Sequence, residues 1–143
     1  MILTKNILAP GKRLLIAGAP AGHDAVVIAE IARNAGRCIV VVAHDDVRLA
    51  GLAEALAFFA PDIERLEFPA WDCLPYDRVS PNPEVVGQRI DTLSRLSSGI
   101  ANQPCILLTT VSAALQRVPP ATEVAGRAIV IRRGDRLDPA NLV

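Results

Sequence analysis

Apolar residues along the chain fall in short runs, and segments with helical spacing follow most of these runs. The runs that predict strands are residues 13–17, 38–43, 63–68 and 105–110. The segments that predict helices are residues 24–34, 45–60, 82–93 and 112–118. After two prolines at 119–120, the pattern predicts a further strand at residues 127–133 and the start of another helix at residues 138–139. Strands that alternate with helices pair in parallel through right-handed crossovers. The pattern therefore predicts an α/β fold with a parallel, doubly wound sheet of the P-loop NTPase type and helices on both faces.

Several residues predict where the helices begin and end. Gly36 can end the first helix in a left-handed conformation, and Asp45 can cap the second. Asn82 followed by Pro83 is a strong signal for a helix start. In that helix Val86, Ile90 and Leu93 fall on one face, which predicts an apolar face toward the core.

Composition narrows the classes of function. Hydrophobic residues make up 51% of the chain but aromatic residues only 3%, so Ala, Val, Ile and Leu must build the core. Fifteen basic residues balance fifteen acidic ones, which leaves no overall positive field to gather DNA. No apolar run approaches the roughly 20 residues that a membrane span needs. We therefore expect a cytoplasmic protein that neither binds DNA by itself nor contacts a membrane.

The cysteines and histidines do not spell out a metal or catalytic site. Cys38, Cys73 and Cys105 are far apart, and His23 and His44 are the only histidines. Such spacing predicts neither a zinc site nor a disulfide framework, and no Ser/His/Asp or Cys/His catalytic set is legible. We expect inert thiols in a reducing compartment and no metal.

The segment GAPAGHD, residues 18–24, has the strand-to-helix layout of a phosphate-binding turn. A functional P-loop reads GxxxxGK[ST], with a lysine for the phosphates and a hydroxyl for Mg²⁺. When Gly22 is aligned with the second glycine, Ala17 stands at the first glycine, His23 at the lysine and Asp24 at the Ser/Thr position, while Gly18 falls on a variable position of the turn. A carboxylate about 4 Å from a phosphate charge costs on the order of 4 kcal/mol at an effective dielectric near 20. We therefore predict a degenerate P-loop that binds no cofactor and contributes to packing.

The alternative is a small nucleotide- or dinucleotide-binding enzyme that uses the turn from Gly18 to Gly22. Asp45 or Asp46 would then stand after the second strand, where a ribose-binding acid belongs. Pro20 occupies the middle of the would-be GxGxxG pattern, which disfavours this hypothesis. Residues 39–46 also mimic a Mg²⁺-binding Walker B element, although a helix cap is the simpler interpretation.

A proline-rich loop follows the third predicted strand. It contains the only tryptophan and the only tyrosine of the chain, Trp71 and Tyr76. Prolines exclude regular structure here, so the large side chains must hold the loop in place. The loop is either a lid over the strand ends or a contact surface for a partner.

The run WDCLPYDRVSPNPEVVGQRIDTLSRL, followed by CILLTTVSAALQRV and RAIVIRRGDRLD, resembles the N-terminal region of the bacterial transcription-repair coupling factors (Mfd). The resemblance extends from about Arg13 to Leu142. The motif positions, which we regard as possible interaction residues, are Trp71, Leu74, Pro75, Tyr76, Asp77, Ser80, Pro81, Arg89, Thr92 and Leu93.

This resemblance implies a module similar to the repair protein UvrB whose P-loop has decayed. Residues 1–118 would form that module, and residues 119–143 would begin a second domain of the UvrA-binding type that is incomplete here. In the family, C-terminal motor domains use ATP and Mg²⁺ to displace RNA polymerase stalled at DNA lesions, and the protein recruits UvrA. The chain itself is then expected to be a non-catalytic scaffold, whose partners are UvrA and the remaining domains. Polymerase and DNA would bind domains that lie outside it.

Overall fold

The computed structural model describes residues 11, 13–20, 22–73, 76, 79–127 and 134. In these residues, strands β1 (Ile39–Ala43), β2 (Glu64–Phe68) and β3 (Cys105–Thr110) form a parallel sheet in the order β1-β3-β2. The helices are α2 (His23–Ala35), α3 (Asp46–Phe59), α4 (Pro83–Ser97), α5 (Val111–Ala114) and α6 (Ala121–Arg127), with a 3₁₀ turn η1 at Ile100–Asn102. The predicted α/β class and parallel pairing are confirmed. The finer prediction of a P-loop NTPase sheet stays a prediction.

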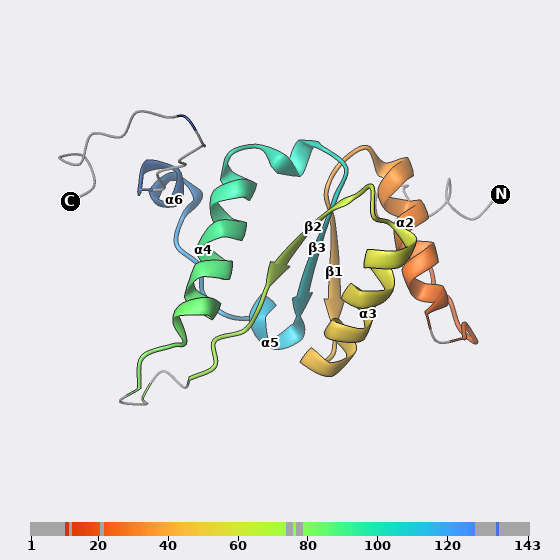
Figure 1. Cartoon of the computed structure of the whole chain (residues 1–143), viewed down its shortest axis with the longest axis horizontal. Coiled ribbons are helices and arrows are strands. Elements are labelled where there is room, and N and C mark those ends of the chain that lie inside the picture. The colour runs from red at the N-terminus through yellow and green to blue at the C-terminus, as the bar shows by residue number, and fades with distance from the viewer. Residues whose placement is uncertain are drawn as a thin grey trace.

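Helices lie on both sides of the sheet, as Figure 1 shows, with α4 on one side and α2 and α3 on the other. Neighbouring residues of parallel strands point to the same face. One face, which we call the α2/α3 face, therefore carries Ile39, Val41, Ile106 and Leu108, and these residues pack with both helices in the main core. The opposite face, the α4 face, carries Leu66 and Phe68. The main core on the α2/α3 face is thus aliphatic, as the composition predicts.

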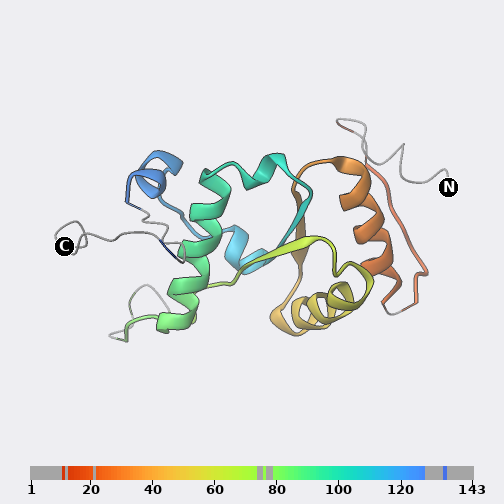
Figure 2. The same ribbon diagram turned by 45° about the horizontal axis from the view of Figure 1, so that its top comes forward.

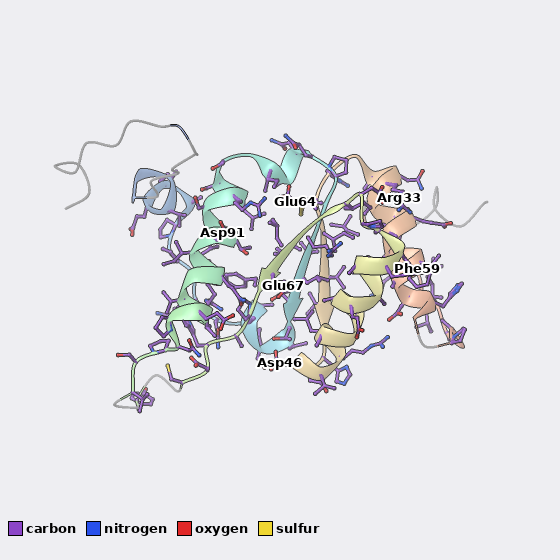
Figure 3. All side chains as sticks on the ribbon, in the orientation of Figure 1. Arg33, Asp46, Phe59, Glu64, Glu67 and Asp91 are labelled. Carbon is purple, nitrogen blue, oxygen red and sulfur yellow. A yellow bond between two sulfur atoms is a disulfide. The ribbon has the colours of Figure 1, made fainter. Side chains whose placement is uncertain are left out.

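The contact between α2 and α3 depends on small side chains. Ala25, Ala29 and Ala32 of α2 are fully or almost fully buried, which lets the two helices approach closely. Arg33, on α2, donates hydrogen bonds to the Asp62 carboxylate and to the Phe59 carbonyl near the end of α3. Figure 3 labels Arg33 and Phe59 at this end of the two helices. The hydrogen bond from Arg33 holds the pKa of Asp62 below its usual value. Because both groups are exposed, this pair orients the helices more than it stabilises them.

The predicted helix boundaries agree with the structure in three places. Gly36 ends α2 with a φ of 64°, and Asp45 accepts the Arg48 backbone N–H at 2.7 Å at the start of α3. Asn82 caps α4 by accepting the Glu84 N–H at 3.0 Å, with Pro83 in the first helical position. These local signals are confirmed: Asp45 and Asn82 satisfy backbone N–H groups that the helices leave unpaired, and Gly36 adopts a left-handed conformation that glycine tolerates.

The predicted strand at residues 13–17 is wrong. The segment pairs with no strand among the described residues, and Leu15 is 89% exposed. In Figures 1 and 2 it runs along the outer side of α2, away from the sheet. An apolar run becomes a strand only when a neighbouring strand receives its backbone hydrogen bonds.

The C-terminal part differs from the prediction in two ways. The helix predicted at residues 112–118 is shorter, because α5 ends at Ala114. Helix α6, which the sequence pattern did not indicate, packs against α4. The predicted strand at residues 127–133 overlaps α6 at Arg127, and the rest of it lies outside the described residues, as does the predicted helix start at residues 138–139.

The predicted apolar face of α4 is also wrong. The residues that α4 buries most deeply are Arg89, Thr92 and Ser94, whereas Ile90 is 55% exposed. Thr92 donates its hydroxyl hydrogen to the Glu67 carbonyl at 2.6 Å. The most buried positions of α4 are thus polar, and Thr92 and Arg89 find acceptors on β2 and on the loop that follows it.

Two of the three cysteines are not free thiols. Cys38 and Cys105 form a disulfide, which corrects the expectation of inert thiols, and Cys73 stays free. Ile39 and Ile106 are partners in the β1–β3 register, so the residues just before them stand opposite one another. The disulfide therefore joins the beginnings of two neighbouring strands.

In the described part of the chain, no helix is both long and apolar enough to cross a membrane.

Candidate functional site

Backbone N–H groups of the N-terminal turn already donate hydrogen bonds within the turn. Gly18 and Gly22 adopt left-handed φ angles of 74° and 85°, as a tight turn requires. The His23 N–H donates to the Pro20 carbonyl at 3.0 Å, and the Ala25 N–H donates to the Gly22 carbonyl at 3.2 Å. These N–H groups belong to the first turn of α2, where a bound phosphate would need them.

Asp24 supplies the negative charge at this helix start. Its carboxylate accepts the Ala25 N–H at 3.0 Å and forms an ion pair with Arg48 of α3. The acidic group is favourable beside the positive end of the α2 dipole, and Arg48 balances it. Ala17 and His23, the other positions of the predicted degenerate motif, are exposed. The site that would hold a phosphate is therefore filled by a side chain of the protein itself.

The acids after β1 also have structural partners. Asp45 accepts the Arg48 N–H as the cap of α3 and lies 2.9 Å from His44 Nε2. Asp46, in the first turn of α3, complements the helix dipole. Each aspartate thus has a structural role that needs no bound ribose.

Arg89 forms the centre of the second candidate site, at the base of the proline loop. Its side chain starts on α4, is only 2% exposed, and donates to the Pro69 carbonyl at 2.6 Å and to Gln116 Oε1 at 3.0 Å. The guanidinium lies over the Phe68 ring at 4.1 Å and the Trp71 ring at 4.2 Å, distances typical of cation–π contacts. Arg89 thus connects the end of β2, the loop and the segment after α5.

No carboxylate among the described residues pairs with this buried charge. Burial lowers the pKa of the Arg89 guanidinium, and its Nε has no hydrogen-bond partner in the described structure. The two aromatic faces and two neutral oxygens replace the water that the cation has lost. Burial of an unpaired charge costs free energy, so the Arg89 side chain depends on these contacts to be stable where it lies.

Two further contacts tie down the two ends of the loop. The Trp71 N–H donates to Gln116 Oε1 at 3.0 Å, so one oxygen receives both Trp71 and Arg89. At the other end, the Asn82 N–H donates to the Asp72 carboxylate at 3.1 Å and 3.2 Å. The loop is therefore closed on itself just before α4 begins.

The loop also presents apolar groups to solvent. Tyr76 is 96% exposed and Val79 is 72% exposed, and Ser80 is exposed beside them. Pro81 and Leu93 are half-buried. The predicted motif residues thus divide into a buried group around Arg89 and an exposed group near Tyr76. Leu74, Pro75 and Asp77 lie outside the described residues.

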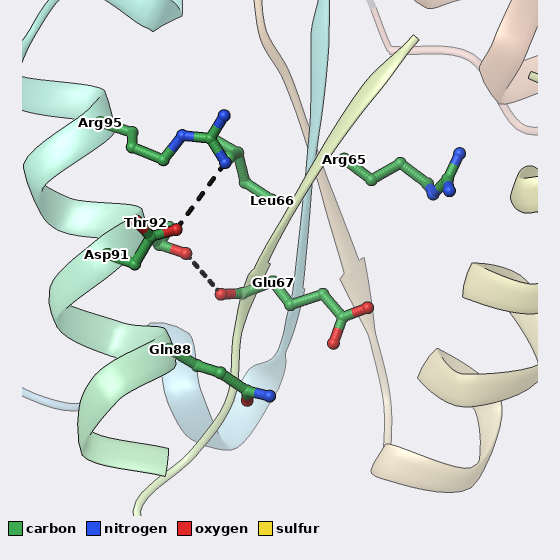
Figure 4. A pocket seen from close by; sticks show the side chains of 7 residues that line it. All are labelled: Arg65, Leu66, Glu67, Gln88, Asp91, Thr92 and Arg95. Atoms are coloured by element: carbon green, nitrogen blue, oxygen red, sulfur yellow. Dashed lines mark hydrogen bonds and ion pairs between the residues drawn. The ribbon is translucent and has the colours of Figure 1, made fainter. Parts of the chain in front are cut away.

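A polar pocket of about 330 Å³ lies between β2 and α4, as Figure 4 shows. Of its charged lining residues, Arg95 pairs with Glu64 beside the pocket and lies 3.7 Å from Asp91, whereas Glu67 forms no ion pair among the described residues. Arg65 donates to the Ala60 carbonyl at 3.2 Å. In the described residues, no cluster of His, Cys, Asp and Glu could hold a metal ion.

The chain is similar in sequence to several proteins that share one name. No protein-family model matches the chain. The transcription-repair-coupling factor of Haemophilus influenzae is 30% identical over 128 residues, which is 90% of this chain and 11% of that protein. Those of Escherichia coli and Rickettsia bellii are 28% and 30% identical over 89% and 62% of the chain. The chain is a relative of the transcription-repair-coupling factors. It spans about a tenth of the length of the curated relatives it matches.

The structure shows what several of the motif residues that resemble the coupling factors do in this chain. Trp71, Arg89 and Thr92 hold the loop and α4 against the end of β2. The sequence identified these three residues but missed Gln116, which accepts from both Trp71 and Arg89. No local signal marks a lone glutamine after a short helix, so only the folded arrangement reveals its role.

Proposed function

We propose that this chain is a non-catalytic scaffold and binding module of a transcription-repair coupling factor, similar to UvrB, with a degenerate nucleotide site. The whole protein would be a cytoplasmic, ATP-driven DNA translocase that displaces RNA polymerase stalled at DNA lesions and recruits UvrA for excision repair. Its motor domains, with ATP and Mg²⁺, would lie outside these 143 residues. The similarity to coupling factors over 90% of the chain supports this proposal.

The observation that carries the non-catalytic part is the ion pair between Asp24 and Arg48 at the start of α2. A phosphate at this position would meet the carboxylate, and the helix N–H groups nearest to it already have acceptors. The strand that leads into a working P-loop is also missing from the sheet at residues 13–17. Charge, hydrogen bonding and topology therefore all disfavour nucleotide binding at this turn.

Calorimetric titration with ATP and with NAD, each with and without Mg²⁺, tests this part. We expect no saturable binding in the micromolar range, because a phosphate would have to displace the Asp24 carboxylate from the Ala25 N–H and from Arg48. A chain with Asp24→Asn keeps the side-chain shape and provides the matched control for charge. Micromolar affinity of the unaltered chain for either nucleotide would instead favour the small nucleotide-dependent enzyme with Gly18, Gly22 and Asp45.

Retention of UvrA tests the binding part. The UvrA contact is expected mainly in the domain that follows, so a chain extended through that domain should retain UvrA in a pull-down where residues 1–143 do not. The extended chain would still lack the motor domains, so ATP hydrolysis cannot cause a difference between the two chains. Equal retention by the short and the extended chain would place the contact inside residues 1–143 and contradict this assignment.

A further inference from the structure

The two cysteines of the disulfide differ in their access to solvent. Cys38, which precedes β1, is half-buried, whereas Cys105, the first residue of β3, is 0% exposed. In thiol–disulfide exchange a thiolate must approach one sulfur of the bond directly, so access decides which cysteine reacts with a molecule from solution. A small thiol can therefore open this disulfide in the folded chain only by attack on Cys38.

The sheet holds the two cysteines side by side whether or not they are bonded. β1 and β3 pair over all five residues of β1, and the cysteines stand at the start of this ladder with their Cα atoms 4.3 Å apart. The Cys38 N–H also donates to the Ala101 carbonyl of η1 at 3.0 Å. These backbone contacts involve neither sulfur, so reduction leaves them intact. Attack between groups held side by side outcompetes attack by a dilute molecule, so Cys105 is placed to close the bond once Cys38 has reacted.

We propose that Cys38 and Cys105 form a reversible exchange site for a low-molecular-weight disulfide of the glutathione type. In oxidation, the Cys38 thiolate attacks one sulfur of the small disulfide, which forms a mixed disulfide on Cys38 and releases one small thiolate. The Cys105 thiolate then attacks the Cys38 sulfur, which forms the protein disulfide and releases the second small thiolate. The two protons of the protein thiols pass through solvent to the two released thiolates. A small thiol in excess reverses both steps.

This site makes a link in the sheet responsive to the redox state of its surroundings. A disulfide with both cysteines fully buried would exchange only after the chain opens. Here exchange at Cys38 proceeds in the folded chain, so the pair follows the ratio of small thiol to small disulfide around it. The covalent link between the starts of β1 and β3 is thus made or lost without unfolding.

Reaction with glutathione disulfide tests the order of the two steps. All chains carry Cys73→Ser, which removes the free thiol and leaves the pair as the only cysteines. Cys105→Ser should accumulate one glutathione on Cys38, and Cys38→Ser should be modified on Cys105 at least about tenfold more slowly. In denaturant the two variants should react at similar rates, which assigns the difference to the fold. Mass spectrometry of the alkylated peptides gives the rates and the modified residue.

The Cys73→Ser chain that keeps both cysteines of the pair provides a test without a change at the site. As the ratio of glutathione to glutathione disulfide is varied, this chain should shift in both directions between dithiol and disulfide, while its circular dichroism stays native. Glutathione trapped by acid during reduction should be found on Cys38. Glutathione trapped on Cys105, equal native rates for the two single-cysteine chains, or exchange that occurs only in denaturant would each overturn the proposal.

Discussion

Reduction of the Cys38–Cys105 disulfide is expected to lower the free energy of unfolding by about 4 kcal/mol. The bond closes a loop with a sequence separation of 67, which contains α3, β2 and α4. A cross-link over such a long loop removes many conformations from the unfolded chain, and the chain-entropy model gives the effect its size. The folded strands need no cross-link to hold them together, because β1 and β3 are already paired.

Denaturant unfolding with and without a thiol reductant measures this difference. Cys38→Ser should show the stability of the reduced protein in both conditions, while Cys73→Ser should behave as the unaltered chain because Cys73 is free. Equal unfolding midpoints of the unaltered chain with and without reductant would contradict the prediction. Because thiols stay reduced in the cytoplasm, the proposed compartment would hold the less stable form.

The parts of the fold that the sequence predicts are those with a local cause. The start of α4 follows from Asn82 and Pro83, and the end of α2 follows from Gly36, because each residue satisfies or fixes its own stretch of backbone. Strand β3 matches its predicted bounds since a run of apolar residues in a central strand is buried on both faces. Local chemistry suffices in these cases.

The failures concern partners that are distant in the sequence. Cys38 and Cys105 meet only because the β1–β3 register places them opposite one another, and a search for close cysteine spacing cannot find such a pair. The segment at residues 13–17 is as apolar as the true strands but has no neighbour to pair with. In the candidate site, Trp71 and Arg89 were identified by family resemblance, whereas Gln116 requires knowledge of the folded loop.

Replacement of Arg89 by alanine is expected to be the most damaging single change at the candidate site. It removes a buried side chain that contacts two aromatic rings, and it leaves the Pro69 carbonyl and the Gln116 side chain without their donor. Losses of packing and of buried hydrogen bonds together predict about 3 kcal/mol of destabilisation. Arg89→Lys should recover only part of this, because an ammonium cannot stack and donate as the planar guanidinium does.

Trp71 reports on this change directly, because it is the only tryptophan of the chain and stacks on Arg89. Its fluorescence should shift to longer wavelength in Arg89→Ala as the loop detaches from α4 and the ring becomes solvated. Arg95→Ala, on the same helix but partly exposed in an ion pair, is the matched control and should cost less than about 1 kcal/mol with unchanged emission. If Arg89→Ala kept both the stability and the emission of the unaltered chain, Arg89 could not be what holds the loop. The exposed group at Tyr76 and Val79 would then need another anchor to act as a contact surface.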